Sequence, residues 1–402
     1  MVMPRAFDRN AATAELRRIT DWWLERSPDG EHGGFVGEID YFGRRVPDAD
    51  KGIILNSRLL WFFSEVARLQ GDDRCRSAAS RSFEYLLHRF DDPQHGGAVW
   101  QLAADGSLRD GKKQVYAQCF CIYAFCAWFD ASGEPAAKEK ALEYVELIET
   151  QARDADEAGY FEAYTRDWRP LGDTLLGPAG LDVSKTMNTH LHLLEAYTAV
   201  HRSFPDETTA RRLRNAIDIL RERILDRQTG HLRLFFDRSW RSLDPVVSFG
   251  HDIEASWLLW EAGETLGDDA LLGSVKSDVL LLAQSCLEQG LAPDGHVCNE
   301  LHPGTGRLAD EAVWWVQAEG LVGFLNALLL GGDTRYRAAV DALWQFICHY
   351  QIDAVGGDWH WFAESHGVPG QKPYKVGFWK APYHNGRAMM EAMRLFERLE
   401  AR

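Results

Sequence analysis

The side chains best suited to chemistry occur in six short segments, each at the start of an apolar, helix-like stretch. These segments are Asn56–Arg58, Tyr116–Gln118, Asn188–His192, His251–Glu254, Trp314–Glu319 and Trp379–Arg387. They hold histidine, which gains and loses a proton near neutral pH, beside arginine, carboxylates and amides that hydrogen-bond polar ligands. Their tryptophans offer flat surfaces for a ring-shaped ligand. The set predicts a site where polar groups and flat rings meet a small-molecule ligand.

Helical spacing determines which of these side chains share a face. Residues three or four apart point the same way, which pairs Asn188 with His192, Trp315 with Glu319, His251 with Glu254 and His384 with Arg387. Glu254 is therefore expected to orient His251 and raise its basicity. His190 and His192 are two apart and point to nearly opposite sides, so they should not chelate a metal together. No cluster has metal-ligand spacing along the chain, and we expect no metal.

A purely structural role is the alternative for each of these residues. Arg58 and Arg387 would then only pair with Glu254 and Glu319 inside a polar core, and the tryptophans would only fill space. Polar residues recur at equivalent positions, however, where an unused core would favour leucine or isoleucine. The recurrence favours a functional site.

A glycine-centred element divides the chain into six parts of similar length. Gly34, Gly97, Gly159, Gly230, Gly295 and Gly357 each precede a short stretch that tends to be aromatic or β-branched, and successive glycines are 62–71 residues apart. Each glycine is expected to adopt a turn conformation that other residues resist. Each repeat has room for two helices of roughly 12–20 residues.

One helix of each pair is predicted to be buried and the other exposed. Segments 118–127 and 319–328 are largely apolar, which is typical of buried helices, whereas 210–220 has one charged face. Six such hairpins close into an all-α (α/α)6 barrel, whose inner helices bring their first residues to one mouth. No linker interrupts the series, so we expect one domain, residues 1–402, with an open solenoid as the alternative.

Composition limits the partners and the compartment. Lys plus Arg is 44 and Asp plus Glu is 60, so the net charge of −16 and the lack of a basic stripe predict no nucleic acid. We see no signal-peptide pattern and no membrane-length apolar run, and we expect a cytoplasmic protein with no membrane contact. The seven cysteines should be reduced and mostly buried. Among the 15 tryptophans, Trp61 and Trp128 should pack helices.

Longer segments around the histidines resemble the N-acylglucosamine 2-epimerase family, and within it the branch that acts on disaccharides. They are Lys185–Thr198, Phe249–Leu259, Trp314–Glu319 and Phe378–Arg387, with Lys51–Arg58 near the start, so the resemblance spans nearly the whole chain. The resemblance implies an (α/α)6 barrel. It also implies reversible inversion at C2 of the reducing-end sugar of a β-1,4-linked disaccharide, of the cellobiose or lactose type, without metal or redox cofactor.

The resemblance also implies roles for individual residues. His251 and His384 are the expected acid–base pair, and His192 assists ring opening or orientation. The remaining site residues are polar contacts (Arg58, Tyr116, Asn188, Glu254), sugar platforms (Trp315, Trp379) and Glu319, whose role is less defined. Two bases on opposite faces of a ring-opened C2 give inversion, and Arg58 or Asn188 would stabilise the enediolate oxyanion. The partner is then a small-molecule sugar, and the enzyme a monomer or homodimer without nucleotide dependence.

Three other functions are weighed against this one. The nearest is a mannose/glucose 2-epimerase or a mannose isomerase acting on free monosaccharides, a choice that depends on mouth loops such as 358–374. The second is glycoside hydrolysis by Glu254 and Glu319, which in an inverting enzyme requires carboxyl groups about 6.5–9.5 Å apart. The third is a non-catalytic binding protein, which the complete histidine set disfavours.

Overall fold

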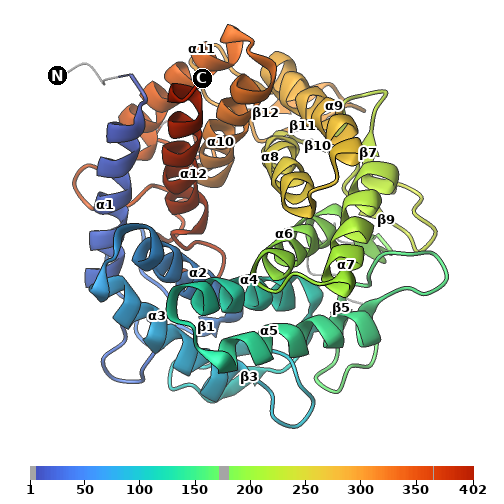
Figure 1. Cartoon of the computed structure of the whole chain (residues 1–402). Helices are drawn as coiled ribbons and strands as arrows, with labels where there is room; N and C mark the ends of the chain where they lie inside the picture. The colour runs from blue at the N-terminus through green and yellow to red at the C-terminus, as the bar shows by residue number, and fades with distance from the viewer. Residues whose placement is uncertain (1–5, 172–180, 365) are drawn as a thin grey trace.

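The computed structural model describes residues 6–171, 181–364 and 366–402, and this part of the chain contains twelve α-helices in two concentric rings (Figure 1). The inner ring consists of α2 (Ile53–Gln70), α4 (Val115–Ser132), α6 (Met187–Ser203), α8 (Phe249–Leu266), α10 (Trp314–Gly331) and α12 (Tyr383–Glu400). The outer ring consists of α1 (Arg9–Arg26), α3 (Asp73–Tyr85), α5 (Pro135–Leu147), α7 (Glu207–Ile219), α9 (Asp269–Ser285) and α11 (Thr334–Phe346).

The ring is closed. Each inner helix packs against the next one along the chain, and α12 packs against α2, so the first and last repeats meet. The first outer helix, α1, lies against α12, so the two ends of the chain together complete the sixth hairpin. The predicted (α/α)6 barrel is confirmed, and the open solenoid is excluded.

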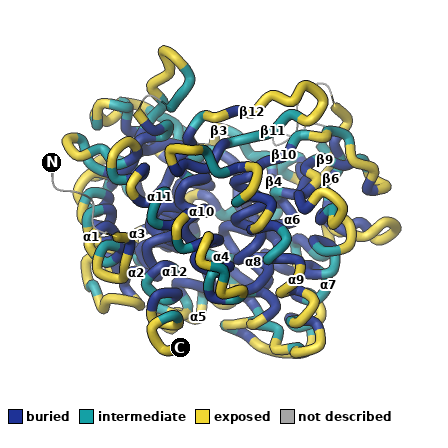
Figure 2. The backbone as a smooth tube through the Cα atoms, turned by 90° about the horizontal axis from the view of Figure 1, so that it is seen from above, coloured by how far each residue is buried: buried dark blue, intermediate teal, exposed yellow. Residues whose placement is uncertain are grey.

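The burial pattern follows the sequence pattern. The inner helix α4 is buried from Val115 to Ile122, whereas the outer helix α7 buries only one stripe and is capped at its start by Asp206. Five outer helices continue into one π-helical turn: Leu86–Phe90, Ile148–Ala152, Leu220–Ile224, Cys286–Gly290 and Ile347–Gln351. Figure 2 shows the inner ring as the buried layer and the exposed loops at the periphery.

Short antiparallel strands connect the hairpins at one end of the barrel. They are β1 (Lys51–Gly52), β2 (Gln101–Leu102), β3 (Leu108–Asp110), β4 (Lys113–Gln114), β5 (Ala163–Tyr164), β6 (Lys185–Thr186), β7 (Leu225–Asp226), β8 (His231–Leu232), β9 (Phe235–Phe236), β10 (Val247–Ser248), β11 (Glu300–His302) and β12 (Arg307–Ala309). In β1–β2, for example, Lys51 pairs with Leu102. Four strands, β1, β4, β6 and β10, end directly before an inner helix and so fix where its first turn lies.

The six repeat glycines behave as predicted, because all of them have a left-handed backbone, with φ between 60° and 97°. The thiol prediction also holds, since all seven cysteines are free, six of them are buried and Cys348 is half-buried. Trp61 stacks on Tyr123, and Trp128 packs near Phe83, as expected for helix-packing rings.

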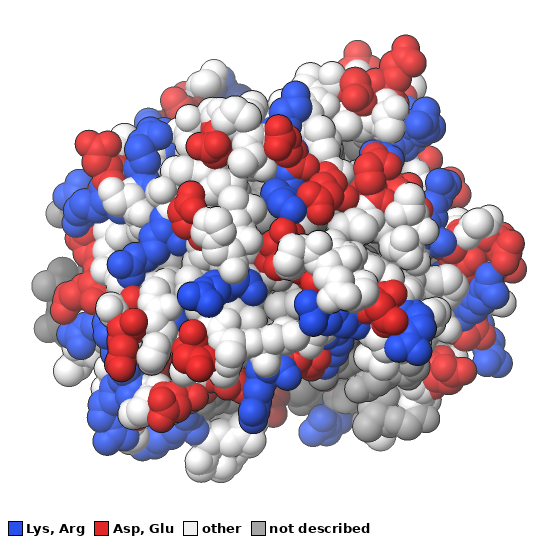
Figure 3. Space-filling view, turned by 90° about the horizontal axis from the view of Figure 1, so that it is seen from below, with Lys and Arg blue, Asp and Glu red and all other residues white. Residues whose placement is uncertain are grey.

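One outer segment is longer and more apolar than the sequence analysis recognised. Asp269–Gly290, which is α9 with its π-helical turn, is long and apolar enough by length and composition to cross a membrane. It packs against α8 in the ring, and its most apolar window is 44% buried. These contacts give the segment a place in the barrel wall. On the side of the molecule in Figure 3, acidic and basic side chains are interspersed.

Candidate active site

A cavity of about 290 Å³ lies inside the ring, where the inner helices begin. It is lined by Arg58, Tyr116, Asn188, His192, His251, Glu254, Trp314, Trp315, Trp361, Trp379 and His384. Nine of the ten site residues predicted from sequence are therefore brought together. The tenth, Glu319, is buried and hydrogen-bonded to one of the lining residues.

His384 is held by a carboxylate from the neighbouring helix. Its Nδ1 lies 2.7 Å from Oε1 of Glu319, and both side chains are buried. Because a carboxylate only accepts, Nδ1 carries the proton, and in the neutral ring Nε2 is left with a lone pair. The geometry therefore prepares His384 to act as a base, and Glu319 would stabilise the imidazolium that results.

His192 has the same arrangement within a single helix. Its Nδ1 lies 2.9 Å from Oε2 of Glu195, three residues further along α6. His190, two residues away, points out of the cavity, where its ring accepts the Tyr160 amide at 3.0 Å and donates to the Thr186 carbonyl at 2.7 Å. The opposite orientation of the two histidines is as the spacing predicted.

His251 has a different partner from the one expected. Its Nδ1 lies 2.8 Å from Oγ of Ser248, the residue before α8. Within the described residues Glu254 makes no hydrogen bond to His251, and the expectation that it orients this ring is wrong. The first turn of α8 carries the two side chains to different neighbours: Glu254 bonds Arg387, on α12. A serine hydroxyl both donates and accepts, so His251 is free to present either a proton or a lone pair.

Arg387 joins three carboxylates: Glu254, which lines the cavity, and Glu195 and Glu319, which are not among its lining residues. Its Nη2 lies 2.7 Å from Oε1 of Glu254 and 2.7 Å from Oε1 of Glu319, while its Nη1 donates to Glu195. All four side chains are buried. One guanidinium therefore links His192, through Glu195, to His384, through Glu319. Burial of three carboxylates is tolerable only with such a counter-charge.

Burial and this charge network set the proton affinities. Burial lowers the pKa of His251 and of His384 to about 3, and also lowers the pKa of His192, so all three rings are neutral at pH 7. Burial alone would raise the pKa of Glu319, but Arg387 and His384 outweigh it and lower that pKa. Burial and repulsion from Glu319 raise the pKa of Glu254. Of this carboxylate pair, Glu254 is thus the one that holds a proton more readily.

Arg58 is available to a ligand. Its Nη1 donates to the Trp379 carbonyl at 2.7 Å and its Nη2 to the Tyr116 hydroxyl at 3.0 Å, while its guanidinium stacks on the Phe120 ring. No carboxylate within the described residues pairs with it. The structural alternative, an Arg58–glutamate pair in the core, is therefore excluded, whereas Arg387 does make such pairs.

Aromatic rings form much of the cavity wall. Trp315 contacts both expected catalytic rings, with its centroid 4.8 Å from that of His251 and 5.6 Å from that of His384. Trp314 and Trp361, 4.2 Å apart, also line the cavity, and sequence reasoning missed both as site residues. Trp314 stood next to a predicted residue, and Trp361 lay in the loop 358–374 that sequence could not position.

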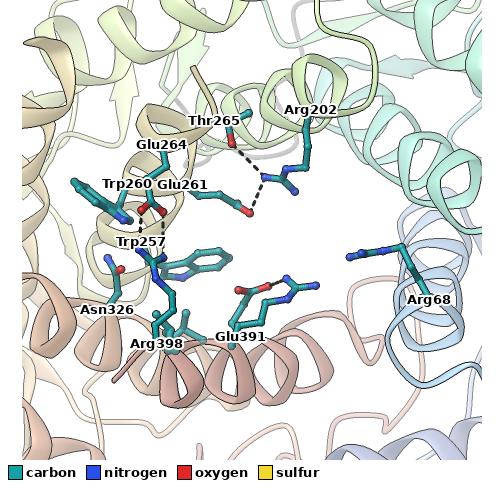
Figure 4. Close-up of a pocket in the computed structure, with 13 residues that line it drawn as sticks. Arg68, Arg202, Trp257, Trp260, Glu261, Glu264, Thr265, Asn326, Glu391 and Arg398 are labelled. Atoms are coloured by element: carbon teal, nitrogen blue, oxygen red, sulfur yellow. Dashed lines mark hydrogen bonds and ion pairs between the residues drawn. The ribbon is translucent and has the colours of Figure 1, made fainter. Parts of the chain in front are cut away.

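The opposite mouth of the barrel has a different character. A second cavity, of about 410 Å³, is lined by the later turns of the inner helices (Figure 4). Ion pairs surround it: Arg202 donates to Glu261 at 2.8 Å, and Arg398 to Glu264 at 2.7 Å. Trp257 lies between the two cavities, since it lines this one and its indole N–H donates to Oε2 of Glu319 at 2.9 Å. The site residues predicted from sequence thus lie at the other mouth, around the first cavity.

The carboxylate geometry disfavours the hydrolase alternative. Glu254 and Glu319 each have an oxygen within 4.8 Å of the other, and both bond the same Arg387 nitrogen. An inverting hydrolase needs its two carboxyl groups about 6.5–9.5 Å apart across the sugar. Here Glu319 lies below the cavity floor and the histidines line the cavity itself.

This fold and this site define a sugar-converting enzyme of the isomerase class, built on an (α/α)6 barrel. The sequence pattern of the N-acylglucosamine 2-epimerase (GlcNAc 2-epimerase) family matches residues 33–388, and the chain belongs to this family. It is 42% identical to the cellobiose 2-epimerase of Bacteroides fragilis over 377 residues, which is 94% of this chain and 96% of that protein.

Solved structures agree with this placement. The cellobiose 2-epimerase of Bacillus thermoamylovorans B4167 superimposes with a TM-score of 0.91 at 34% identity, covering 96% of this chain and 98% of that one. A D-mannose isomerase superimposes with a TM-score of 0.85 at 18% identity, covering 98% and 100%, which shows a shared fold.

Proposed function

We propose that this enzyme reversibly inverts C2 of the reducing-end sugar of a β-1,4-linked disaccharide of the cellobiose or lactose type. The observation that carries the proposal is the placement of His251 and His384 around one cavity, both in contact with Trp315 but with different Nδ1 partners. The 42% identity to a protein named cellobiose 2-epimerase supports the disaccharide as substrate.

The first chemical step is removal of the C2 proton from the ring-opened sugar. The C1 carbonyl acidifies this proton, and in the proposed step Nε2 of His384 accepts it, a role supported by the bond between its Nδ1 and Glu319. The product is an enediolate, whose charge is stabilised by Arg58 and the nearby amide of Asn188. The inner helices also direct the positive ends of their dipoles toward this mouth.

The second step returns a proton to the other face of C2. For this step His251 first takes up a second proton from water, so that its far nitrogen donates to C2 while its Nδ1 donates to the Ser248 hydroxyl, and a neutral ring is left. His384, protonated in the first step, then returns its extra proton to water. In the reverse direction the two histidines exchange roles. His192, oriented by Glu195, is placed to move the proton between O5 and O1 during ring opening.

The test is incubation of the enzyme in D₂O with cellobiose, lactose, mannose, glucose and N-acetylglucosamine, followed by NMR of the products. The proposal expects a disaccharide of altered C2 stereochemistry that carries deuterium at C2. A ketose from mannose, with no conversion of disaccharides, would instead support the monosaccharide isomerase. Released glucose would support hydrolysis.

The wider expectations belong to the same proposal. We infer that residues 1–402 act as one domain, in the cytoplasm, as a monomer or homodimer, on a sugar and without nucleic acid, membrane or nucleotide. The ring contacts between the first and last repeats support the single domain.

A further inference from the structure

Most repeats close their turn with a buried lysine and an aspartate. The lysine lies shortly before an inner helix, and its Nζ bonds the aspartate and a carbonyl of the same turn. The pairs are Lys51–Asp29, Lys113–Asp92, Lys185–Asp154 and Lys375–Asp353. We call this arrangement the clasp. The clasp places the lysine ammonium group against the turn that carries the repeat glycine.

Within the described residues the fourth and fifth repeats have no lysine clasp. In the fourth repeat Asp226 pairs instead with Arg233 at 2.9 Å, and in the fifth repeat both the aspartate and the lysine are replaced. Ala292 takes the position of the aspartate, because its amide bonds His296 across the turn as the amide of Asp92 bonds Gly97. Ala312 takes the position of the lysine, two residues before α10. At this turn Asp294 and His296 instead meet His366, which comes from the loop 358–374, with one ligand atom from each of the three lying within 4.8 Å of the others.

The two imidazoles face the carboxylate with fixed nitrogens. Nδ1 of His296 lies 2.6 Å from Oδ1 of Asp294, and Nε2 of His366 lies 2.9 Å from its Oδ2. The far nitrogens are engaged by backbone: Nε2 of His296 lies 3.0 Å from the Asp310 carbonyl, and Nδ1 of His366 lies 3.0 Å from the Glu364 carbonyl. Carbonyls only accept, so both far nitrogens carry the hydrogen.

The geometry of this cluster suits a bound cation. With the far nitrogens bonded to carbonyls, the near nitrogens present lone pairs to the oxygens of a carboxylate, which also only accept. A divalent metal ion between them would accept an electron pair from each of the three side chains. A backbone carbonyl bonded to the far ring nitrogen is also the usual support of a metal-ligating histidine.

We propose that Asp294, His296 and His366 form a binding site for a divalent transition-metal ion of the Zn²⁺ class. Two imidazole nitrogens and one carboxylate oxygen are ligands that Zn²⁺ accepts, with water as the fourth. Ligand atoms in such a tetrahedron are about 3.3 Å apart, and here one ligand atom from each side chain already lies within 4.8 Å of the other two. Phe346 packs against both rings and limits their rotation.

The ion would fasten a mouth loop to the fifth repeat. The His366 carbonyl accepts from the Ala312 amide at 2.8 Å, and Val313 pairs with Phe362, so the loop lies beside the start of α10. Trp361, in the same loop, lines the catalytic cavity. The metal thus takes the place of the missing clasp and steadies one wall of that cavity, without touching the reacting atoms.

The experiment titrates Zn²⁺, and separately Co²⁺, into tag-free, chelator-treated full-length protein. The expected result is one equivalent of Zn²⁺ bound in calorimetry and the visible absorption typical of Co²⁺ with tetrahedral ligands. His366→Ala and Asp294→Asn should each weaken binding at least tenfold and abolish the Co²⁺ bands. The matched control is His349→Ala, because His349 is an exposed histidine whose ring bonds only its own helix.

Two outcomes would overturn the proposal. In the first, the wild-type protein binds no more Zn²⁺ than His366→Ala does. In the second, His349→Ala loses as much Zn²⁺ binding as His366→Ala. Circular dichroism of each variant checks folding, and Asp294→Asn keeps the side-chain volume if His366→Ala unfolds. Because metal binding is measured directly, a negative result leaves the proposed epimerase activity unaffected, and an inactive enzyme would leave the metal result unaffected.

Discussion

The substitution Glu319→Gln tests the histidine chemistry most directly, because three donors share this one carboxylate. His384 Nδ1 and Arg387 Nη2 both bond Oε1, each at 2.7 Å, and the Trp257 indole bonds Oε2 at 2.9 Å. An amide has one accepting oxygen and one donating NH₂ group. If its oxygen faces His384 and Arg387, the NH₂ group faces the Trp257 N–H. If it turns round, the NH₂ group faces Arg387 and His384.

Both orientations are costly, but in different ways. A buried donor left facing a donor costs about 1–3 kcal/mol of stability. In the second orientation the amide also donates to Nδ1 of His384, which moves the ring proton to Nε2 and removes the lone pair that should accept the C2 proton. In both, the imidazolium loses its counter-charge. Loss of the correct histidine tautomer costs up to about 10⁴ in rate in serine proteases, so we expect kcat to fall about 10²–10⁴-fold, or about 2.7–5.4 kcal/mol.

The assay is deuterium exchange at C2 of cellobiose in D₂O, followed by NMR, beside chemical denaturation of the same variant. Glu264→Gln is the matched control, because this glutamate makes an ion pair with Arg398 at the opposite mouth. It should keep C2 exchange within about twofold of wild type. The reasoning would be refuted if Glu319→Gln kept exchange within tenfold of wild type, or if Glu264→Gln lost as much.

Three further predictions follow from the same structure. Arg387→Met leaves buried carboxylates without their counter-charge and should cost about 3–5 kcal/mol of stability, which lowers Tm by about 4–6 °C for a chain of this size. Arg387 lowers the pKa of Glu195 and Glu319 below their unfolded values, so the loss of stability relative to wild type should be larger at pH 7 than at pH 4. A loss of stability that did not change with pH would contradict this prediction. Because burial lowers the pKa of His384, the base stays neutral in mild acid, and the acidic limb of the kcat/KM profile should lie below about pH 6.5; a limb above that value would argue against His384 as the base. Gly159→Ala places a methyl group 2.4 Å from the Trp240 ring at φ +78° and should cost about 2–4 kcal/mol of stability. The matched control is Gly43→Ala, at φ +79° with nothing within 4 Å, which should cost about 1 kcal/mol of stability. Equal denaturation midpoints for the two variants would disprove the steric argument.

The fold was predictable because its signals are local and repeated. Glycine spacing marked the turns, and the apolar pattern separated inner from outer helices. The convergence of polar side chains at one mouth then followed, since helices that run the same way begin at the same end. Residues predicted on that basis, such as Arg58 and Asn188, do line the cavity.

Partners between helices were not predictable in the same way. Sequence spacing suggested Glu254 as the partner of His251, but the glutamate bonded to a histidine of the proposed acid–base pair is Glu319, 65 residues before His384 in the chain. Such pairings depend on how far neighbouring helices are rotated and shifted relative to each other. The residue spacing within a single helix carries no information about this. The same limit applies to Asp294 and His366, which are 72 residues apart. The expectation of no metal considered spacing along the chain alone.

Arg387 and Trp257 form a buried partition between the two cavities, and this limits how a sugar can enter and leave the site. Among the described residues this partition closes the far side of the cavity, so for the proposed reaction a sugar enters from the mouth with its reducing end foremost and leaves by the same route. A second substrate molecule can bind only after the product has left the cavity. The rest of a longer glucan chain can trail outside the mouth, but a sugar unit in the middle of a chain never reaches His251 and His384. Selectivity for chain ends is thus set by the shape of the chamber, before any hydrogen bond to the sugar is made.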